Sequence, residues 1–415
     1  MRILFFSHYF PPEGNAPASR TYENCRRWVE AGHDVTVVTG APSVPDGVVY
    51  EGYHNRLLPQ RETIDGIDVI RVWTYIAANK GTLRRILNFV SYMVSAVLCT
   101  LFSKRPDLII ATSPQFFCGW AGVIMRFLRR IPFILEIRDI WPESIQAVGA
   151  MQGGAAVRLL EWMELKMYGA ADHIVTVGEG YRQRLLEKGV PEEKLSVIMN
   201  GVDRNLFAPR EKDPDLVARY GLADKFVCAY IGTIGMACAL DVVLRAATLL
   251  KSQGRNDIVF LLVGDGAVRE DLAAEAEALG LDNVVFTGRQ DKRIMPAFLS
   301  VTDACLVHLK KTDLFTSVIP SKIFEAGGMA RPIIMGVEGN AAEIVAEAAM
   351  GVFMEPEQES ALVEALTTLS EDPELARRLG QSGHDYIVKH FDRSTLSEHY
   401  LAILQQVLDC MKGKR

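Results

Sequence analysis

The amino-acid sequence predicts an α/β protein with two parallel-sheet domains, and three observations favour this fold class. The chain has 415 residues, which is more than one ordinary hydrophobic core organises. Near the N-terminus a strand, a polar loop, a helix and a second strand follow one another, an order typical of a parallel sheet covered by helices. The same alternation begins afresh at Phe226–Ile231, after a polar stretch that contains Pro209 and Pro214.

In the first half, short apolar runs alternate with segments of helical spacing. The expected strands are Arg2–Ser7, Asp34–Thr39, Val69–Trp73, Leu108–Thr112, Pro132–Ile137, His173–Val177 and Leu195–Met199. The expected helices are Ala18–Ala31, Leu83–Phe102, Phe116–Leu128, Ala155–Tyr168 and Glu179–Lys188. Open α/β sheets bind ligands at the carboxyl ends of their strands, so we look for the site in the loops that follow these strands.

The second half repeats this pattern. Its expected strands are Phe226–Ile231, Ile258–Val263, Val284–Thr287, Ala304–His308 and Gly351–Met354. The apolar spacing of Ser394–Lys412 predicts a final helix long enough to reach back to the first domain. We therefore expect a first domain of residues 1–203, completed by 394–415, and a second domain of residues 204–393.

Composition indicates a globular protein with reduced thiols. Hydrophobic residues make up 49% of the chain and charged residues 23%. The seven cysteines are scattered, odd in number and without a C-x-x-C pair, which argues against a disulfide framework or a zinc site and for a cytosol-like compartment. The apolar run Ile3–Phe6 is too short for a signal peptide. Asp213-Pro214-Asp215 matches a bare D-x-D metal motif, but no strand leads into it and we interpret it as a chance match.

A basic, apolar segment lies between residues 80 and 130. It contains one acid, Asp107, and eight basic residues, of which we expect Arg84, Arg85, Lys104, Arg105, Arg129 and Arg130 to face a membrane surface. The helix Leu83–Phe102 either rests on the membrane interface, packs internally or spans the bilayer. Because Asn88, Ser91, Ser95 and Thr100 dilute it, we favour the interface over a span.

Polar and glycine residues follow several strands of the expected first sheet. The loop after the first strand contains Gly14 and Asn15, where the backbone can approach a ligand. Arg138 and Asp139 come directly after the strand Pro132–Ile137, and Glu143 follows closely. Arg138 is suited to a phosphate, and Asp139 or Glu143 to a sugar hydroxyl. The alternative is that Arg138 and Asp139 pair with each other or cap the next helix.

In the second half, Gly232-Thr233-Ile234-Gly235 follows the first strand and Gly288 follows the third. Gly232 and Gly235 are expected to present bare N–H groups to a phosphate. The stretch Pro320-Ser321-Lys322-Ile323-Phe324-Glu325 predicts a helix start with a capping-type serine and a lysine in the first turn. A diphosphate suits this lysine, and Glu325, one turn on, can accept hydrogen bonds from a ribose diol. The alternative is a capped helix with a surface Lys322–Glu325 pair.

Taken together, six stretches resemble retaining nucleotide-sugar glycosyltransferases of family 4, whose GT-B architecture consists of two facing Rossmann-like domains. The resemblance extends to bacterial transferases of O-antigen, capsule and exopolysaccharide clusters, including those that handle N-acetyl-fucosamine-type sugars. The stretches that carry it are Pro11–Arg20, Glu136–Ser144, Asn200–Asp203, Gly232–Gly235, Gly264–Gly266 and Pro320–Pro332. It covers essentially the whole chain.

The resemblance implies a role for each domain. The second domain would bind the nucleotide-sugar through Gly232, Thr233, Gly235, Gly288, Pro320, Ser321, Lys322 and Glu325, with Gly14 and Asn15 near the diphosphate. The first domain would bind the acceptor, with Arg20, Ser113 and Glu143 in the cleft and Asp139, Arg138 and Lys322 serving catalysis. No metal, cofactor or nucleic-acid partner is expected, since positive groups and helix dipoles stabilise the leaving diphosphate.

Four positions depart from the family pattern. Thr233 and Cys238 occupy positions where many members have an arginine and a lysine, and Ser317 stands where many have a glutamate that contacts the donor sugar. The usual histidine before Asp139 is Arg138. Lys322 and Arg138 are therefore expected to carry the charge that meets phosphate, and Ser317 favours a deoxy sugar.

These observations predict transfer of a sugar, with retention, from a UDP-sugar to a polyprenyl-diphosphate-linked saccharide. The protein would act in the cytoplasm at the inner face of the bacterial plasma membrane. Two alternatives stay open. One is a non-catalytic membrane-associated subunit, motivated by the missing arginine and lysine. The other is a UDP-sugar 2-epimerase, against which the basic apolar segment argues.

Overall fold

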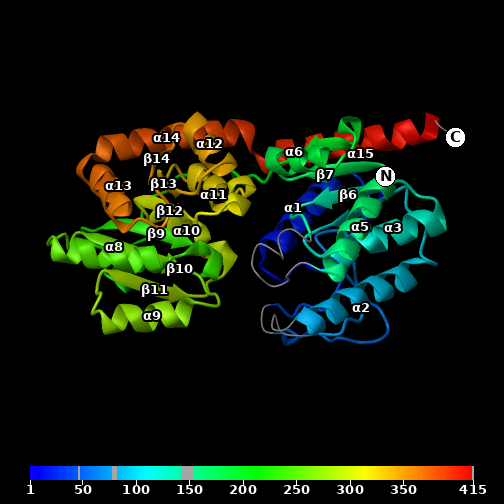
Figure 1. Cartoon of the computed structure of the whole chain (residues 1–415), viewed down its shortest axis with the longest axis horizontal. Helices are drawn as coiled ribbons and strands as arrows, with labels where there is room; N and C mark the ends of the chain where they lie inside the picture. Colours follow the sequence, from blue (N-terminus) through cyan, green and yellow to red (C-terminus); the bar gives the residue numbers. More distant parts are fainter. Residues whose placement is uncertain (45–46, 77–81, 142–153, 414–415) are drawn as a thin grey trace. The chain divides into compact units, whose positions relative to one another are not determined.

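The chain folds into two α/β units. The computed structural model describes residues 1–44, 47–76, 82–141 and 154–413, so Glu143 lies outside the described residues. Unit 1 consists of Met1–Met199 and Ser394–Arg415, and unit 2 of Asn200–Arg393. Each unit contains a sheet with helices on its faces (Figure 1). The predicted α/β class with two parallel-sheet domains is confirmed.

Unit 1 contains an eight-stranded sheet in the order β3-β4-β2-β1-β5-β6-β7-β8. All neighbouring strands are parallel except β3 and β4. The strands are β1 (Arg2–Phe6), β2 (Asp34–Thr39), β3 (Gln60–Ile64), β4 (Ile67–Arg71), β5 (Leu108–Thr112), β6 (Phe133–Ile137), β7 (His173–Thr176) and β8 (Leu195–Val197). The β3–β4 hairpin was not predicted. Its two-residue turn, Asp65-Gly66, has positive φ at both residues, as tight hairpin turns require.

The helices of unit 1 pack on two apolar cores, one on each face of the sheet. Because side chains alternate along a strand, Ile3 and Phe5 enter one core and Leu4 and Phe6 the other. Helices α1 and α15 cover the first core, and α2, α3 and α5 the second. The helices are α1 (Ala16–Glu30), α2 (Thr82–Thr100), α3 (Phe116–Arg129), α5 (Ala155–Ala170), α6 (Glu179–Glu187), the 3-10 turn η1 (Glu192–Lys194) and α15 (Arg393–Gly413).

Helix α15 completes unit 1 although the chain before it belongs to unit 2. Its buried residues Tyr400, Leu404, Val407 and Leu408 join the core beside α1. The ring of Tyr400 meets that of Trp28 edge to face, with 5.2 Å between centroids. The expected return of the last helix to the first domain is thus confirmed.

Unit 2 contains a six-stranded, fully parallel sheet in the order β11-β10-β9-β12-β13-β14. The strands are β9 (Phe226–Ile231), β10 (Ile258–Val263), β11 (Val284–Gly288), β12 (Ala304–His308), β13 (Ile333–Gly336) and β14 (Gly351–Phe353). The helices are α7 (Pro214–Tyr220), α8 (Asp241–Ser252), α9 (Arg269–Ala278), α10 (Met295–Ser300), α11 (Lys322–Gly328), α12 (Asn340–Glu347), α13 (Glu359–Glu371) and α14 (Pro373–His390), with 3-10 turns η2 (Met236–Cys238), η3 (Lys292–Ile294) and η4 (Asp313–Ser317).

Helix α2, for which three environments were considered, packs along one side against the core of unit 1. Phe89, Tyr92 and Ala96 are buried, whereas Val94 and Leu98 are exposed. Among the helices that the structure describes, none is long and apolar enough to cross a bilayer. The spanning alternative is therefore wrong, and α2 combines a packed face with an exposed apolar one.

Replacing Tyr400 by alanine tests the docking of α15. The side chain is fully buried against Trp28, so Tyr400→Ala leaves a cavity and lowers the free energy of unfolding by about 3–5 kcal/mol. The measurement is urea unfolding of the whole chain. Gln406→Ala, an exposed position on the same helix, is the control and changes the free energy of unfolding by less than about 0.5 kcal/mol. Equal effects of the two substitutions would contradict this packing.

Candidate functional site

In unit 1, Ser113 braces the loop that carries Arg138 and Asp139. Ser113 follows β5, and the loop follows the neighbouring strand β6. The backbone N–H of Arg138 donates to Ser113 Oγ at 2.7 Å, and that of Asp139 at 3.2 Å. Parallel strands end at one edge of the sheet, and this hydroxyl fixes the two residues there. Ser113 thus acts on their backbone.

Arg20 lies in the interior of unit 1. Its Nε donates to Glu136 Oε2 at 3.2 Å, and its terminal nitrogens donate to the carbonyls of Ile198 and Met199 at 2.7 and 2.9 Å. Both side chains of the ion pair are buried, at 8% and 0% exposure. We expected Arg20 to contact the acceptor or the cleft. Its N–H donors instead bond to groups inside the fold, so its role in this structure is structural.

Glu136 is a fully buried carboxylate that must be compensated. Burial alone would raise its pKa, but Arg20, Arg138 and the Thr112 hydroxyl, which donates to Oε1 at 2.8 Å, together lower the pKa below its ordinary value. Sequence reasoning missed this residue as a partner of Arg20, because the two are far apart in the chain.

Arg138 contributes a second guanidinium, in addition to that of Arg20, near the carboxylate of Glu136. Its Nη1 donates to the carbonyl of Pro17 at 3.2 Å. Burial lowers its pKa to about 10, which Glu136 opposes, so it is still protonated at neutral pH. Two guanidiniums thus act on the carboxylate of Glu136, and Asp139 adds a second carboxylate in the loop that carries Arg138. No Arg138–Asp139 ion pair forms among the described contacts, so the expected pairing alternative is not seen.

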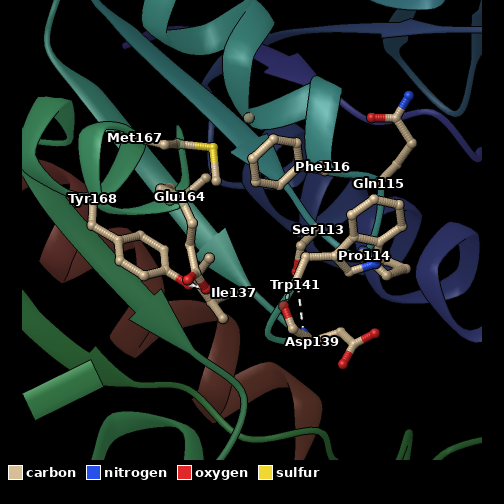
Figure 2. Close-up of a pocket in the computed structure, with 12 residues that line it drawn as sticks. Ser113, Pro114, Gln115, Phe116, Ile137, Asp139, Trp141, Glu164, Met167 and Tyr168 are labelled. Carbon is tan, nitrogen blue, oxygen red and sulfur yellow. Dashed lines mark hydrogen bonds between the residues drawn. The ribbon is translucent and has the colours of Figure 1, made fainter. Parts of the chain in front are cut away.

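A pocket adjoins this loop (Figure 2). Its walls contain Ser113, Pro114, Gln115, Phe116, Gly119, Leu135, Ile137, Asp139, Trp141, Glu164, Met167 and Tyr168. The rings of Trp141 and Phe116 are stacked, with centroids 5.8 Å apart. Glu164, on α5, is buried and accepts hydrogen bonds from Tyr168 at 2.6 Å and Lys188 at 2.7 Å. No sequence pattern marked Glu164 as a site residue, since it lies within a helical pattern.

The loop after β1 is held by two charged residues that sequence reasoning missed. Glu13 is buried and accepts hydrogen bonds from the N–H groups of Ser43 and Val44. Arg71 Nη2 donates to the carbonyl of Pro11 at 2.6 Å. The sequence signal that could have found Glu13 is the presence of a charged residue within a loop rich in proline and glycine.

Gly14 and Asn15 have different surroundings in this loop. Asn15 Oδ1 accepts from Ala18 N at 2.9 Å and caps α1, so its side chain serves the helix. Gly14 is exposed, and a Cβ built on it meets no atom within 4 Å. Of the two, Gly14 offers backbone that a ligand can approach.

In unit 2, the loops after β9 and β10 pack backbone against backbone. Gly232 and Gly264 both have φ of +142°, and a Cβ on Gly264 would lie 1.9 Å from the carbonyl oxygen of Gly232. Gly232 N donates to the Val263 carbonyl and Gly264 N to the Gly288 carbonyl, at 2.9 and 3.1 Å. The expectation of a bare N–H group is therefore wrong for Gly232, because the neighbouring strand end uses it.

Thr233 and Cys238 surround the hydroxyl of Tyr230. That hydroxyl donates to the carbonyl of Thr233 at 2.8 Å and lies 3.0 Å from Cys238 Sγ. Gly235 adjoins the 3-10 turn Met236–Cys238. The groups described around this hydroxyl are thus uncharged.

The stretch from Pro320 to Glu325 begins α11, but not as expected. Ser321 has helical backbone angles, and its hydroxyl accepts no hydrogen bond from the N–H groups of this helix, so the predicted cap is wrong. Lys322 Nζ lies over the ring of Tyr230, 3.3 Å from its centroid. Within the described part of the chain Lys322 makes no ion pair, so the expected surface pair with Glu325 is not formed.

Lys322 is a half-buried cation. Burial lowers its pKa to about 8, while Cys238, Glu325 and Cys305 act in the opposite direction. Glu325 follows one helical turn later and is half-buried. An ammonium with three N–H donors and no carboxylate partner is suited to an anion.

The described residues hold no group of three or more His, Cys, Asp or Glu side chains that could bind a metal ion. In the D-x-D match, Asp213 caps α7 by accepting from the N–H groups of Asp215 and Leu216. A helix cap accounts for this motif.

Comparison with known proteins connects this geometry to a family. Residues 15–201 match the glycosyl transferase 4-like domain and residues 214–386 match the glycosyl transferases group 1. Over 434 residues, covering all of both chains, the sequence is 26% identical to a putative colanic acid biosynthesis glycosyl transferase, WcaI, of Escherichia coli (strain K12).

Solved structures show the same fold. Sucrose-phosphate synthase from Thermosynechococcus elongatus is similar with a TM-score of 0.75 and 17% identity, over 99% of each chain. Anabaena Alr3699/HepE in complex with UDP-glucose is similar with a TM-score of 0.72 and 17% identity, over 98% of this chain and 100% of that one. The expected GT-B fold is confirmed.

Substituting Glu136 by glutamine tests the buried charge cluster. It leaves Arg20 and Arg138 without a carboxylate and lowers the free energy of unfolding by about 3–5 kcal/mol at pH 7. Glu187→Gln, which breaks an exposed pair with Arg184, costs less than about 1 kcal/mol and is the control.

The buried carboxylate of Glu136 also predicts that the free energy of unfolding depends on pH, and the same two variants test this. The folded-state pKa of Glu136 lies below its ordinary value of 4.5, so the unfolded chain binds more protons in that window. The stability from Glu136 is present above pH 4.5 and is lost as pH falls through the folded pKa. Urea unfolding between pH 3 and 6 is the measurement. If the free energy of unfolding of Glu136→Gln fell with pH as steeply as that of the wild type, Glu136 would not be the source of the pH dependence.

Proposed function

Because this chain belongs to the family 4, group 1 glycosyltransferases, we propose that it transfers a sugar, with retention, from a UDP-sugar to a polyprenyl-diphosphate-linked saccharide. The setting is the synthesis of a bacterial surface polysaccharide, at the cytoplasmic face of the plasma membrane. The observation that carries the proposal is the half-buried Lys322 at the carboxyl end of the unit 2 sheet, a cation without a carboxylate partner.

The donor would bind to unit 2. Lys322 offers three N–H donors to the diphosphate, and Glu325, one turn further along α11, accepts from the ribose diol. Thr233 and Gly235 after β9, Pro320 and Ser321 before α11, and Gly288 at the end of β11 are proposed donor contacts. Gly232 is proposed through its lack of a side chain, since its N–H is already bonded.

Unit 1 would bind the acceptor. Arg138 contributes the positive charge for a phosphate group, and Asp139 is placed beside the pocket to orient a sugar hydroxyl. Ser113 holds both backbones in place. Glu143 stays a prediction for the acceptor side.

In the proposed reaction, the bond between the anomeric carbon and the phosphate oxygen breaks as the acceptor oxygen attacks from the same face. UDP leaves with the bonding electrons, and its phosphate oxygen takes the acceptor proton. Lys322 would stabilise the charge that grows on the diphosphate. The donor sugar stays a hypothesis: Ser317 favours a deoxy sugar, and the N-acetyl group rests on the family resemblance alone.

The membrane contact is proposed for the outer surface of α2 and α3. Phe102, Phe127 and Leu128 are 90%, 67% and 58% exposed, which is unusual for side chains of this size. Arg84, Arg85, Lys104, Arg105 and Arg130 are exposed on the same elements or their ends. Apolar side chains among cations suit a surface of anionic lipid.

Arg129 differs from the other basic residues of this surface. It is half-buried, and its Nη1 donates to the carbonyls of Thr100 and Ser103, so it joins α3 to the end of α2. The surface continues onto α5, which packs beside α3 and exposes Leu159, Trp162 and Leu165, with Lys166 over the Trp162 ring. Trp and Lys at this position are typical of a membrane interface.

Nucleotide binding tests the donor site. In a thermal-shift panel of UDP, GDP, ADP, TDP and CMP, UDP should raise the melting temperature most, since a ligand at 100 times its Kd adds about 2.7 kcal/mol. Lys322→Met should abolish most of the rise. A rise with GDP or ADP alone would change the donor, and no rise with any nucleotide would favour a non-catalytic subunit. Conversion of a UDP-sugar without acceptor would favour the 2-epimerase.

The lowered pKa of Lys322 predicts that UDP binding is linked to protons. Above about pH 8 the unliganded ammonium loses its proton, and the bound diphosphate restores it. UDP affinity should therefore fall as pH rises through 8, with proton uptake on binding at pH 9 in calorimetry across buffers of different ionisation enthalpy. Lys322→Met should show neither. Uptake that persists in this variant would assign the proton to a group other than Lys322.

Vesicle binding tests the membrane surface. The wild-type protein should sediment with vesicles that contain phosphatidylglycerol, and Lys104→Gln/Arg105→Gln should weaken this about 10- to 30-fold, since each cation contributes about 1 kcal/mol. Arg377→Gln/Arg378→Gln removes the same charge from exposed positions on α14 of unit 2 and is the matched control. Equal loss in both variants would mean that net charge, rather than this surface, decides binding.

A further inference from the structure

The ammonium of Lys322 rests on an aromatic face. Its Nζ lies 3.3 Å from the centroid of the Tyr230 ring, well inside the distance of about 6 Å at which a cation is attracted by a ring. Among the described residues it has no hydrogen bond or ion pair. The contact that holds this cation in unit 2 is therefore the ring itself.

Tyr230 is a rigid support. It is a residue of β9 with 2% exposure, and its ring belongs to the apolar core of unit 2. Its hydroxyl donates to the Thr233 carbonyl and contacts Cys238 Sγ. The strand backbone, the core packing and the hydroxyl contacts hold the Tyr230 ring in one position. The ring can therefore position the ammonium of Lys322, which lies on it.

The space beside the ammonium depends on Gly232. A Cβ on this residue would lie 3.3 Å from Lys322 Nζ and 3.5 Å from Cε. The lysine side chain thus runs between the ring and a strand end that has no side chain. Its position is defined from two sides although it forms no hydrogen bond.

We propose that Tyr230 is a positioning residue for Lys322: its ring holds the ammonium at the carboxyl end of the unit 2 sheet and leaves the N–H donors that point away from the ring for a diphosphate. The inference rests on the proposed function, because it assigns Lys322 to the donor diphosphate.

The physical reason lies in what a carboxylate would do in the same place. A carboxylate would neutralise the ammonium and occupy its donors, so the diphosphate would have to displace it. An aromatic face attracts the cation electrostatically and accepts no conventional hydrogen bond from it. The ring therefore orders the side chain before the ligand arrives, which reduces the ordering cost of binding.

The experiment is calorimetric titration of the full chain with UDP at pH 7. Tyr230→Phe keeps the ring and should bind UDP within about two-fold of wild type. Tyr230→Leu removes the ring and should weaken binding about ten-fold. In the double variant with Lys322→Met, the Tyr230→Leu change should add almost nothing, because the ring acts through the lysine.

Two further variants separate positioning from stability. Phe260→Leu removes an equally buried aromatic ring from the neighbouring strand β10 and should leave UDP affinity within about two-fold. Tyr230→Met, with a flexible side chain that fills the space, replaces the leucine variant if the latter does not fold. Loss of affinity in Phe260→Leu equal to that in Tyr230→Leu would show a structural effect and overturn the proposal.

The outcomes separate this inference from the function on which it rests. If the wild type binds none of UDP, GDP, ADP and TDP, the donor site itself is wrong and the inference falls with it. If Lys322→Met weakens binding while Tyr230→Leu does not, the donor site stands and the positioning role is overturned. Independent, additive effects of the two substitutions would overturn it as well.

Discussion

Much of the candidate site in unit 2 depends on the close approach of two loops. No side chain fits at Gly264, because its Cβ would lie 1.9 Å from the carbonyl oxygen of Gly232. The loops after β9 and β10 therefore bond to each other, with Gly232 N donating to Val263 and Ile234 N to Asp265. These amides are used in loop packing and cannot also serve a phosphate. Lys322 adds a positive side-chain charge at this edge.

The order of strands explains why much of this could be predicted from sequence. Short apolar runs give strand positions, and a parallel sheet brings the residues after each run to one edge, so Arg138 and Asp139 were expected there. Lys322 was expected from the helix start at Pro320-Ser321. The β3–β4 hairpin was missed because its Asp65-Gly66 turn lies among polar residues with weak strand patterning. The start of α1 was missed by two residues because capping depends on backbone geometry: Asn15 caps this helix through its side chain, whereas Ser321, at the expected N-cap position of α11, forms no such hydrogen bond.

Partners distant in sequence could not be predicted from one sequence. Arg20 pairs with Glu136, and Lys322 with the ring of Tyr230, through contacts that only the tertiary fold creates. A sequence shows that a cation is near a strand end, but not whether a carboxylate already neutralises it. Arg20 and Lys322 were equally plausible ligands for an anion on residue type alone. Their surroundings in the structure distinguish them.

The two units treat Arg20 and Lys322 in opposite ways, and this difference bears on function. Arg20 has a carboxylate at 3.2 Å and two carbonyls, so its charge is compensated without any ligand. Lys322 has an aromatic ring and no anion, and the lowered pKa shows that its charged form is disfavoured in the unliganded fold. A fold optimised for stability alone would pair or remove such a cation. Under the proposed function, the desolvation of Lys322 has already occurred in the unliganded fold, so it would not reduce the affinity for a diphosphate, and the anion would offset its cost by charge attraction.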